Sequence, residues 1–124
     1  MEEIVSTLSS HPKIAQVHFP THFKNPEQQR IRDAQCEGPG ALFSIELAGG
    51  KAAAFDFLRR LKIARNAVSF GGVESLVCHP KTTTHSGFTP AESIDAGITD
   101  GLVRCAIGVE DWRDLLADFE RALG

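Results

Sequence analysis

An arginine in the middle of an apolar segment is the residue whose type and position point most directly to chemistry. Arg104 lies within L-V-R-C-A-I-G, and most of its neighbours there favour burial. Charged side chains are seldom buried without a partner, and the planar guanidinium group suits a carboxylate or phosphate better than an ammonium does. The segment therefore predicts an anion beside Arg104, from the protein or from a ligand. An internal ion pair, or a position on the solvent face of an edge strand, would explain the same pattern.

Cys78, His79 and His85 are of types that bind metals or act in nucleophilic catalysis. No C-x-x-C or H-x-x-x-H spacing accompanies them, and a structural zinc ion needs a complete set of four ligands. A cysteine nucleophile would come with a recognisable elbow or oxyanion-hole signature, which this sequence lacks. Gly71-Gly72 lacks the lysine and the further glycine of phosphate-binding loops. We therefore predict a tight turn at the two glycines, and neither a metal site nor a catalytic residue in this region.

The first half of the chain contains patterns for three helices and two strands. Apolar residues at helical spacing indicate the first and third helices, and alternation of apolar and polar residues indicates the strands. Asn25 and Pro26 give the second helix a side-chain cap and a proline in its first turn. The expected helices cover residues 2–10, 26–36 and 51–61, and the expected strands cover 14–19 and 41–47.

The second half adds β-like segments and two helices. The β-like segments are expected at 63–69, 76–79 and 102–108. Thr89 and Pro90 begin a short helix that Gly97 ends, and a final helix is expected over 110–123. Helices packed on one face of a small, mainly antiparallel sheet satisfy this order, so we predict a two-layer α+β sandwich formed as one domain by residues 1–124.

Three apolar faces are expected to form the core of this sandwich. On the strand at 41–47 the buried side chains are every second residue, and on the two longer helices they follow the helical period. The expected strand residues are Phe43, Ile45 and Leu47; those of the 51–61 helix are Ala54, Phe55, Leu58 and Leu61; and those of the final helix are Trp112, Leu115, Leu116, Phe119 and Leu123.

The composition argues against several classes of protein. The formal net charge is -3, and the basic residues are scattered instead of forming a stripe, which argues against a nucleic-acid-binding protein. No apolar run approaches the roughly 20 residues of a membrane-spanning helix, and the acidic start is unlike a secretory signal. Three widely spaced cysteines do not suggest a disulfide framework. We therefore expect a cytoplasmic protein without nucleic-acid or membrane partners.

From about Leu8 onward, the chain resembles the C-terminal domain of the pyridoxal-phosphate-dependent enzymes of Cys/Met metabolism. This family includes cystathionine synthases and lyases, methionine γ-lyase and homoserine-ester sulfhydrylases. The most specific motifs are V-S-F-G-G-V-E-S-L-V-C-H-P, T-T-T-H-S-G-F-T-P and A-G-I-T-D-G-L-V-R-C-A-I-G-V-E-D. The resemblance also includes H-P-K-I-A-Q-V-H-F-P and G-P-G-A-L-F-S-I-E-L, so it covers nearly the whole chain.

The resemblance implies an anion for Arg104. In this family the arginine of the L-V-R strand pairs with the α-carboxylate of the amino-acid substrate, and the serine at the position of Ser69 helps to hold the same group. Val68 matches a position that varies with substrate preference. An apolar residue there resembles the γ-lyase and sulfhydrylase pattern more than the cystathionine pattern. The implied reaction of a complete enzyme is elimination or replacement at the β- or γ-carbon of a sulfur amino acid or homoserine ester.

The resemblance also implies that this chain lacks much of the family's catalytic apparatus. Family members carry the Schiff-base lysine, the pyridine-nitrogen aspartate, the stacking tyrosine and the phosphate-binding loop in an N-terminal and central portion. None of the lysines here lies in the Ser-x-x-Lys context of the family: Lys13, Lys24, Lys51, Lys62 and Lys81. We therefore expect pyridoxal phosphate to be held by a missing large domain, and the chain alone to be inactive.

Other interpretations predict different partners. The domain could be a non-catalytic module that binds an amino acid or a protein, or one part of a split enzyme completed by a second chain. Residues 1–10 would form the tail of the helix that leads from the large domain. Without that domain, exposed apolar surface should favour self-association.

Overall fold

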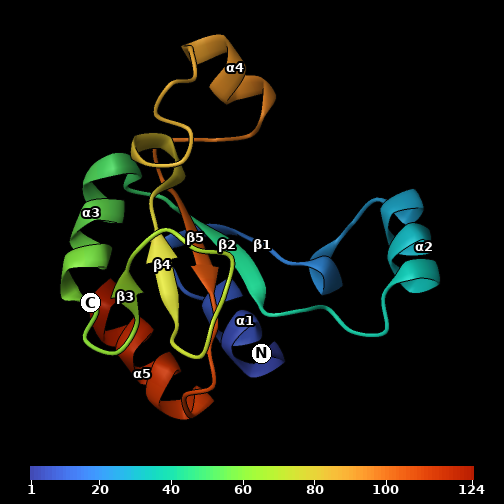
Figure 1. Ribbon diagram of the computed structural model, residues 1–124, viewed down its shortest axis with the longest axis horizontal. Helices are drawn as coiled ribbons and strands as arrows, with labels where there is room; N and C mark the ends of the chain where they lie inside the picture. Colours follow the sequence, from blue (N-terminus) through green and yellow to red (C-terminus); the bar gives the residue numbers. More distant parts are fainter.

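The computed structural model describes all residues from 1 to 124, and its centre is a five-stranded sheet (Figure 1). The strands follow the order β1-β2-β5-β4-β3, and each neighbouring pair is antiparallel except β3 with β4. Their bounds are Ile14–His18 for β1, Leu42–Leu47 for β2, Arg65–Asn66 for β3, Leu76–Cys78 for β4 and Leu102–Ala106 for β5. The last strand in the sequence therefore lies in the middle of the sheet.

Three helices pack on one face of the sheet and enclose the hydrophobic core: α1 (Glu2–Ser9), α3 (Gly50–Arg60) and α5 (Trp112–Leu123). Phe57 and Phe119 pack against each other between α3 and α5, with their ring centroids 5.9 Å apart. Phe43 of β2 meets Phe119 edge to face. The predicted two-layer α+β sandwich is confirmed, and its core lies between these helices and the sheet.

The remaining helices project from the sandwich (Figure 1). Helix α2 (Pro26–Gln35) has no buried residue and follows the short 3-10 turn Pro20–His22. Helix α4 (Pro90–Asp95) follows a second such turn, Pro80–Thr82. Both predicted caps are confirmed: the Asn25 side chain accepts the Glu27 N–H at 2.8 Å, and Thr89 forms a capping box with Glu92.

The alternation of β2 and β5 places their side chains on opposite faces of the sheet. As predicted, Phe43, Ile45 and Leu47 of β2 are buried in the core. On β5, Val103 and Cys105 face the same core. Arg104 therefore points to the other face, because successive residues of a strand alternate between the two faces. The period-two alternation thus decides on which face of the sheet the arginine lies.

Two predicted details are wrong. On α3 the buried stripe consists of Ala54, Phe57 and Leu58, whereas Phe55 lies at its edge and is exposed. Leu61, also expected in that stripe, follows the end of the helix in an extended conformation and packs, half-buried, against the core. The β-like segment expected at 63–69 shortens to the two residues of β3, because the Ala67 N–H forms the last backbone hydrogen bond to β4 and the chain leaves the sheet edge after it.

The final helix follows the predicted pattern with two additions, Ala122 and a carboxylate. Leu115, Phe119 and Leu123 are buried as expected, while Trp112 and Leu116 are half-buried at the rim. A carboxylate, Asp118, is buried on the same side of the helix. The sequence pattern did not indicate that position, because an acidic residue on a helix usually faces water.

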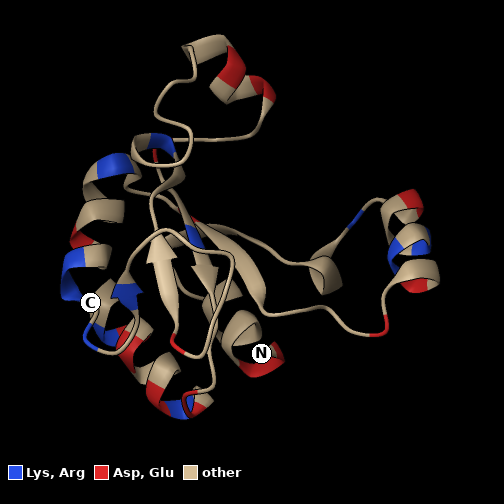
Figure 2. Ribbon diagram, viewed as in Figure 1, with Lys and Arg blue, Asp and Glu red and all other residues tan.

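Charges of both signs are distributed over α2, α3 and α5 (Figure 2). In this view the Lys and Arg positions are spread over several elements and do not gather on one of them. None of the helices has the length and apolar character that crossing a bilayer requires.

Candidate functional site

Arg104 lies in the centre of the sheet, on the face away from the helices. Its register partners are Ser44 on β2 and Cys78 on β4. The side chain is half-buried, and it takes part in none of the eight ion pairs of the chain. The internal ion pair that would have explained the arginine is therefore not formed.

The other arginines show how unusual this position is. Six of the eight arginines pair with an acidic side chain: Arg30, Arg32, Arg59, Arg65, Arg113 and Arg121. Of the two without an acidic partner, Arg60 is exposed on α3. Arg104 alone combines partial burial in the sheet with the absence of a carboxylate partner, and desolvation without a counter-charge is costly.

The guanidinium group of Arg104 is held by the loop that leads from β3 to β4. Its Nη2 donates a hydrogen bond to the Ser69 carbonyl oxygen at 3.2 Å. The Phe70 ring lies over the guanidinium, 4.5 Å from its central carbon to the ring centroid. Figure 1 shows this loop in front of the sheet, with β5 behind it. These two contacts fix one edge and one face of the cation and leave its remaining donors for another acceptor.

Of the residues predicted for the site, Ser69 contacts Arg104 through its backbone carbonyl, and Val68 is its neighbour in the chain. The Ser69 side chain does not itself contact Arg104; its hydroxyl accepts the Gly71 N–H at 3.2 Å within the same turn. Gly71 has a φ of 146°, a conformation that residues with a Cβ rarely adopt, so the turn depends on glycine. Val68 precedes this turn, and its apolar side chain is 53% exposed.

Two groups near this site were not found from the sequence. Phe70 is 79% exposed and covers Arg104, although its place beside Ser69 in V-S-F-G-G was visible in the sequence. Glu110 accepts the Ser75 N–H at 2.7 Å and the Ser75 hydroxyl at 2.8 Å. Burial would raise the pKa of Glu110, but these hydrogen bonds outweigh it and hold the pKa below the ordinary value.

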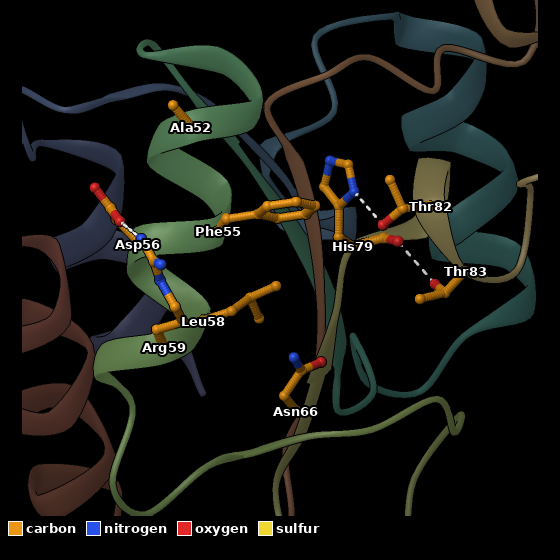
Figure 3. Close-up of a pocket in the computed structure, with 9 residues that line it drawn as sticks. All are labelled: Ala52, Phe55, Asp56, Leu58, Arg59, Asn66, His79, Thr82 and Thr83. Carbon is orange, nitrogen blue, oxygen red and sulfur yellow. Dashed lines mark hydrogen bonds and ion pairs between the residues drawn. The ribbon is translucent and has the colours of Figure 1, made fainter.

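A pocket of about 600 Å³ lies elsewhere, between α3 and the turn after β4 (Figure 3). Phe55 points from α3 toward the buried ring of His79, and the two rings meet edge to face with centroids 5.2 Å apart. The lining of this pocket includes neither Arg104 nor any residue of the loop between β3 and β4. The pocket beside α3 and the unpaired arginine are therefore two separate features of the molecule.

Both ring nitrogens of His79 are already bonded. Nε2 lies 2.8 Å from the Asp100 carbonyl oxygen and Nδ1 lies 2.8 Å from the Thr82 hydroxyl. Because a carbonyl only accepts, Nε2 carries the proton and Nδ1 is free to accept from Thr82. This histidine joins the turn after β4 to the chain before β5, and neither of its nitrogens is free for a metal ion.

The cysteines are placed as small interior residues. Cys78 and Cys105 are buried, and Cys36 is exposed in the arm that bears α2. Burial raises the pKa of the Cys105 thiol far above its ordinary value, with a further contribution from nearby Cys78. A thiol in this state is a poor nucleophile, because the thiolate is the reactive form.

Comparison with known proteins identifies relatives over almost the whole chain. The sequence profile of the Cys/Met metabolism PLP-dependent enzymes matches residues 2–124. L-methionine gamma-lyase of Fusobacterium nucleatum subsp. polymorphum is 42% identical over 122 residues, which are 98% of this chain and 31% of that protein. Cystathionine gamma-synthase of Escherichia coli K12 is 38% identical over 119 residues, or 96% of this chain and 31% of the relative.

Solved structures agree with this assignment. The crystal structure of cystathionine gamma synthase from Xanthomonas oryzae pv. oryzae, in complex with aminoacrylate and cysteine, superposes with a TM-score of 0.89 at 40% identity. That alignment covers 98% of this chain and 31% of the other. The chain thus spans less than a third of the length of these relatives.

Proposed function

The chain belongs to the PLP-dependent enzymes of Cys/Met metabolism, and we propose that it is the C-terminal, substrate-carboxylate-binding domain of such an enzyme. In this proposal Arg104 receives the α-carboxylate of an amino-acid substrate. The observation that carries the proposal is a half-buried guanidinium that no acidic side chain of the chain neutralises. A carboxylate offers the planar pair of acceptors that this group pairs with best.

The surroundings of Arg104 support a role in orientation. The Ser69 carbonyl and the Phe70 ring hold the guanidinium against rotation, so an incoming carboxylate meets a pre-positioned pair of donors. A carboxylate fixed in two places also fixes the direction of the other bonds at the α-carbon. The Ser69 hydroxyl would turn from its bond within the loop to the same carboxylate.

The cofactor chemistry of the family does not fit the residues of this chain. Pyridoxal phosphate, when bound, supplies the electron sink for carbanion chemistry. A lysine would have to reach it, and none of the five lysines forms a hydrogen bond or ion pair with the residues around Arg104. Lys13 donates to the carbonyls of Leu123 and Gly124, and Lys81 pairs with Asp100. We infer that the cofactor is held by the remainder of the enzyme and that this chain alone does not catalyse the reaction.

The proposed reaction of the complete enzyme is elimination or replacement at the β- or γ-carbon of a sulfur amino acid or homoserine ester. The relatives include gamma-lyases, a gamma-synthase and an O-acetyl-L-homoserine sulfhydrylase, and these names span both kinds of reaction. The exposed apolar side chain of Val68, next to Ser69 in the chain, supports a substrate with an apolar side chain over cystathionine, whose far end is charged.

The direct test is a titration of the chain with L-methionine, followed by two-dimensional 15N–1H spectra. The comparison ligand is 3-(methylthio)propylamine, which is methionine without its carboxylate. We expect methionine, and not the amine, to shift the resonances of Arg104 and of the loop that bears Ser69. Arg104→Ala should weaken methionine binding roughly 10- to 100-fold, because a charge-assisted hydrogen bond contributes about 1.5–3 kcal/mol.

Arg60→Ala is the matched control, because Arg60 also lacks an acidic partner but lies exposed on α3. It should bind methionine as the unmodified chain does. Equal binding by the Arg104→Ala variant would contradict the proposed site. Turnover of methionine by the chain with added pyridoxal phosphate would contradict the proposed division of labour. Turnover only after addition of a separately expressed large domain would support it.

A further inference from the structure

The β3–β4 loop, residues 67–75, is fastened at both of its ends. At the β3 end, the Ala67 N–H donates to the Val77 carbonyl at 3.1 Å. At the β4 end, the Arg65 N–H donates to the Ser75 carbonyl at 2.9 Å. The interior of the loop, residues 68–72, forms no backbone hydrogen bond to the rest of the chain apart from the one that Arg104 donates to Ser69. The position of this interior is therefore set by its ends and by the arginine.

The β4 end of the loop is held by a carboxylate that lies between β5 and α5. Both oxygens of Glu110 accept hydrogen bonds from Ser75, one from its N–H and one from its hydroxyl. The Ser75 oxygen in turn accepts the Gly108 N–H at 2.9 Å. Ser75 is completely buried, so water cannot replace these bonds without local opening. We call this set of three residues, Glu110, Ser75 and Gly108, the loop clamp.

The fit of the loop against β5 is close enough to exclude a side chain at Gly108. A Cβ at this position would lie 2.6 Å from the Glu74 carbonyl carbon and closer still to the Val73 carbonyl oxygen. That same Val73 oxygen accepts the Val109 N–H at 2.9 Å. Two backbone segments thus lie directly against each other, and the loop clamp keeps them there.

We propose that Glu110 is a positioning residue for Arg104, acting through Ser75 and the β3–β4 loop. This inference rests on the proposed carboxylate site. Glu110 does not touch the guanidinium; it fixes the end of the loop whose interior supplies the Ser69 carbonyl and the Phe70 ring. Without the clamp, the loop keeps only its backbone hydrogen bonds at this end, and the two contacts that orient the free donors of the guanidinium loosen. Carboxylate binding then weakens although Arg104 itself is unchanged.

The test compares Glu110→Gln, Glu110→Ala and Ser75→Ala with the unmodified chain. Glu74→Gln is the matched control, because Glu74 lies in the same loop and pairs only with the exposed Arg65. The first readout needs no ligand: the Arg104 Nε–H resonance and its relaxation report how firmly the guanidinium is held. The second is the affinity for L-methionine, corrected for the folded fraction measured by urea unfolding.

We expect the Arg104 guanidinium to become more mobile in the three clamp variants and to stay unchanged in Glu74→Gln. Methionine affinity should fall roughly 10-fold in Glu110→Ala and less in Glu110→Gln, whose side-chain oxygen still accepts one bond. Because Glu110 acts through Arg104, the double variant with Arg104→Ala should bind no more weakly than Arg104→Ala alone. A purely structural role would lower stability without these changes.

The outcomes separate this inference from the proposed function. If Arg104→Ala binds methionine normally, the carboxylate site is wrong, and the mobility of the Arg104 side chain still decides the role of Glu110. If Arg104→Ala loses binding while the clamp variants bind normally with an unchanged Arg104 resonance, the positioning role is overturned. Should Glu110→Ala fail to fold, Glu110→Gln and Ser75→Ala provide the same readouts.

Discussion

The buried carboxylate of Asp118 offers the sharpest test of how the sandwich is held together. It accepts the backbone N–H groups of Lys62 at 2.9 Å, Ile63 at 2.8 Å and Ala64 at 3.1 Å, and it pairs with Arg121. These three donors belong to the turn that leads from α3 to β3. One side chain on α5 therefore fixes the path by which the chain leaves α3.

The cost of Asp118→Ala follows from those three donors. The Ala64 N–H is buried, so leaving it without an acceptor costs about 1–3 kcal/mol, and each of the other two bonds contributes about 1 kcal/mol net. We therefore expect a loss of about 3–5 kcal/mol in the free energy of unfolding. That is a large part of the roughly 5–15 kcal/mol by which small domains are stable. Asp118→Asn should lose less, because its amide oxygen still accepts.

The same group predicts a pH dependence. Burial would raise the pKa of Asp118, but the backbone donors and Arg121 outweigh it and hold the pKa below the ordinary carboxyl value. A depressed folded-state pKa means that the unfolded chain takes up the proton first. The stabilisation by Asp118 is therefore complete above the unfolded pKa of about 4 and is lost as the pH falls through the lower folded pKa. Asp118→Asn should remove this part of the acid sensitivity.

The assay is urea unfolding followed by circular dichroism at neutral pH and at acidic pH. At a typical dependence on urea for a domain of this size, the expected loss lowers the midpoint by roughly 2 M. Glu120→Ala, an exposed carboxylate on the same helix, is the control and should change stability by less than about 0.5 kcal/mol. A loss below about 1 kcal/mol for Asp118→Ala would refute this reasoning.

Three further predictions concern the loop over the sheet. Gly108→Ala should lower the free energy of unfolding by about 1–3 kcal/mol, because the added Cβ overlaps the backbone of the neighbouring loop. Gly72→Ala is the control and should be nearly neutral, because no atom lies within 4 Å of a Cβ built at Gly72. Urea unfolding of the two variants tests this difference. Phe70→Leu should weaken methionine binding about two- to five-fold in the same titration, since a cation–π contact contributes roughly 0.5–1 kcal/mol. The exposed apolar side chains of this loop should make the chain self-associate, which sedimentation velocity would detect. Val73→Lys should reduce this association, and a monomer at high concentration would contradict the prediction.

The periodic parts of the fold were predictable because they depend on local rules. Alternation in 41–47 assigned the buried side of β2, and the caps at Asn25 and Thr89 located the starts of two helices. Errors appeared at the margins of such patterns. Phe55 and Phe57 are two positions apart on α3, and only the packing against α5 decides which of them is buried.

The carboxylates that organise the loops were not predictable in the same way. The bonds of Asp118 reach backbone groups 54 to 56 positions away, and those of Glu110 reach 35 positions. Nothing in the local sequence distinguishes these residues from solvated acids. Arg104 was different, because a charge inside an apolar strand is unusual on local grounds alone. The sequence therefore indicated an anion, and its resemblance to a family indicated which one.

A crystal structure of the chain soaked with L-methionine would show whether Arg104 binds the carboxylate of an amino acid. We expect the methionine carboxylate in a paired contact with the Arg104 guanidinium, beside the Ser69 and Phe70 loop, with N–O distances of about 2.7–2.9 Å. Methionine bound elsewhere, such as in the pocket beside Phe55 and His79, with Arg104 still bonded only to Ser69, would contradict it.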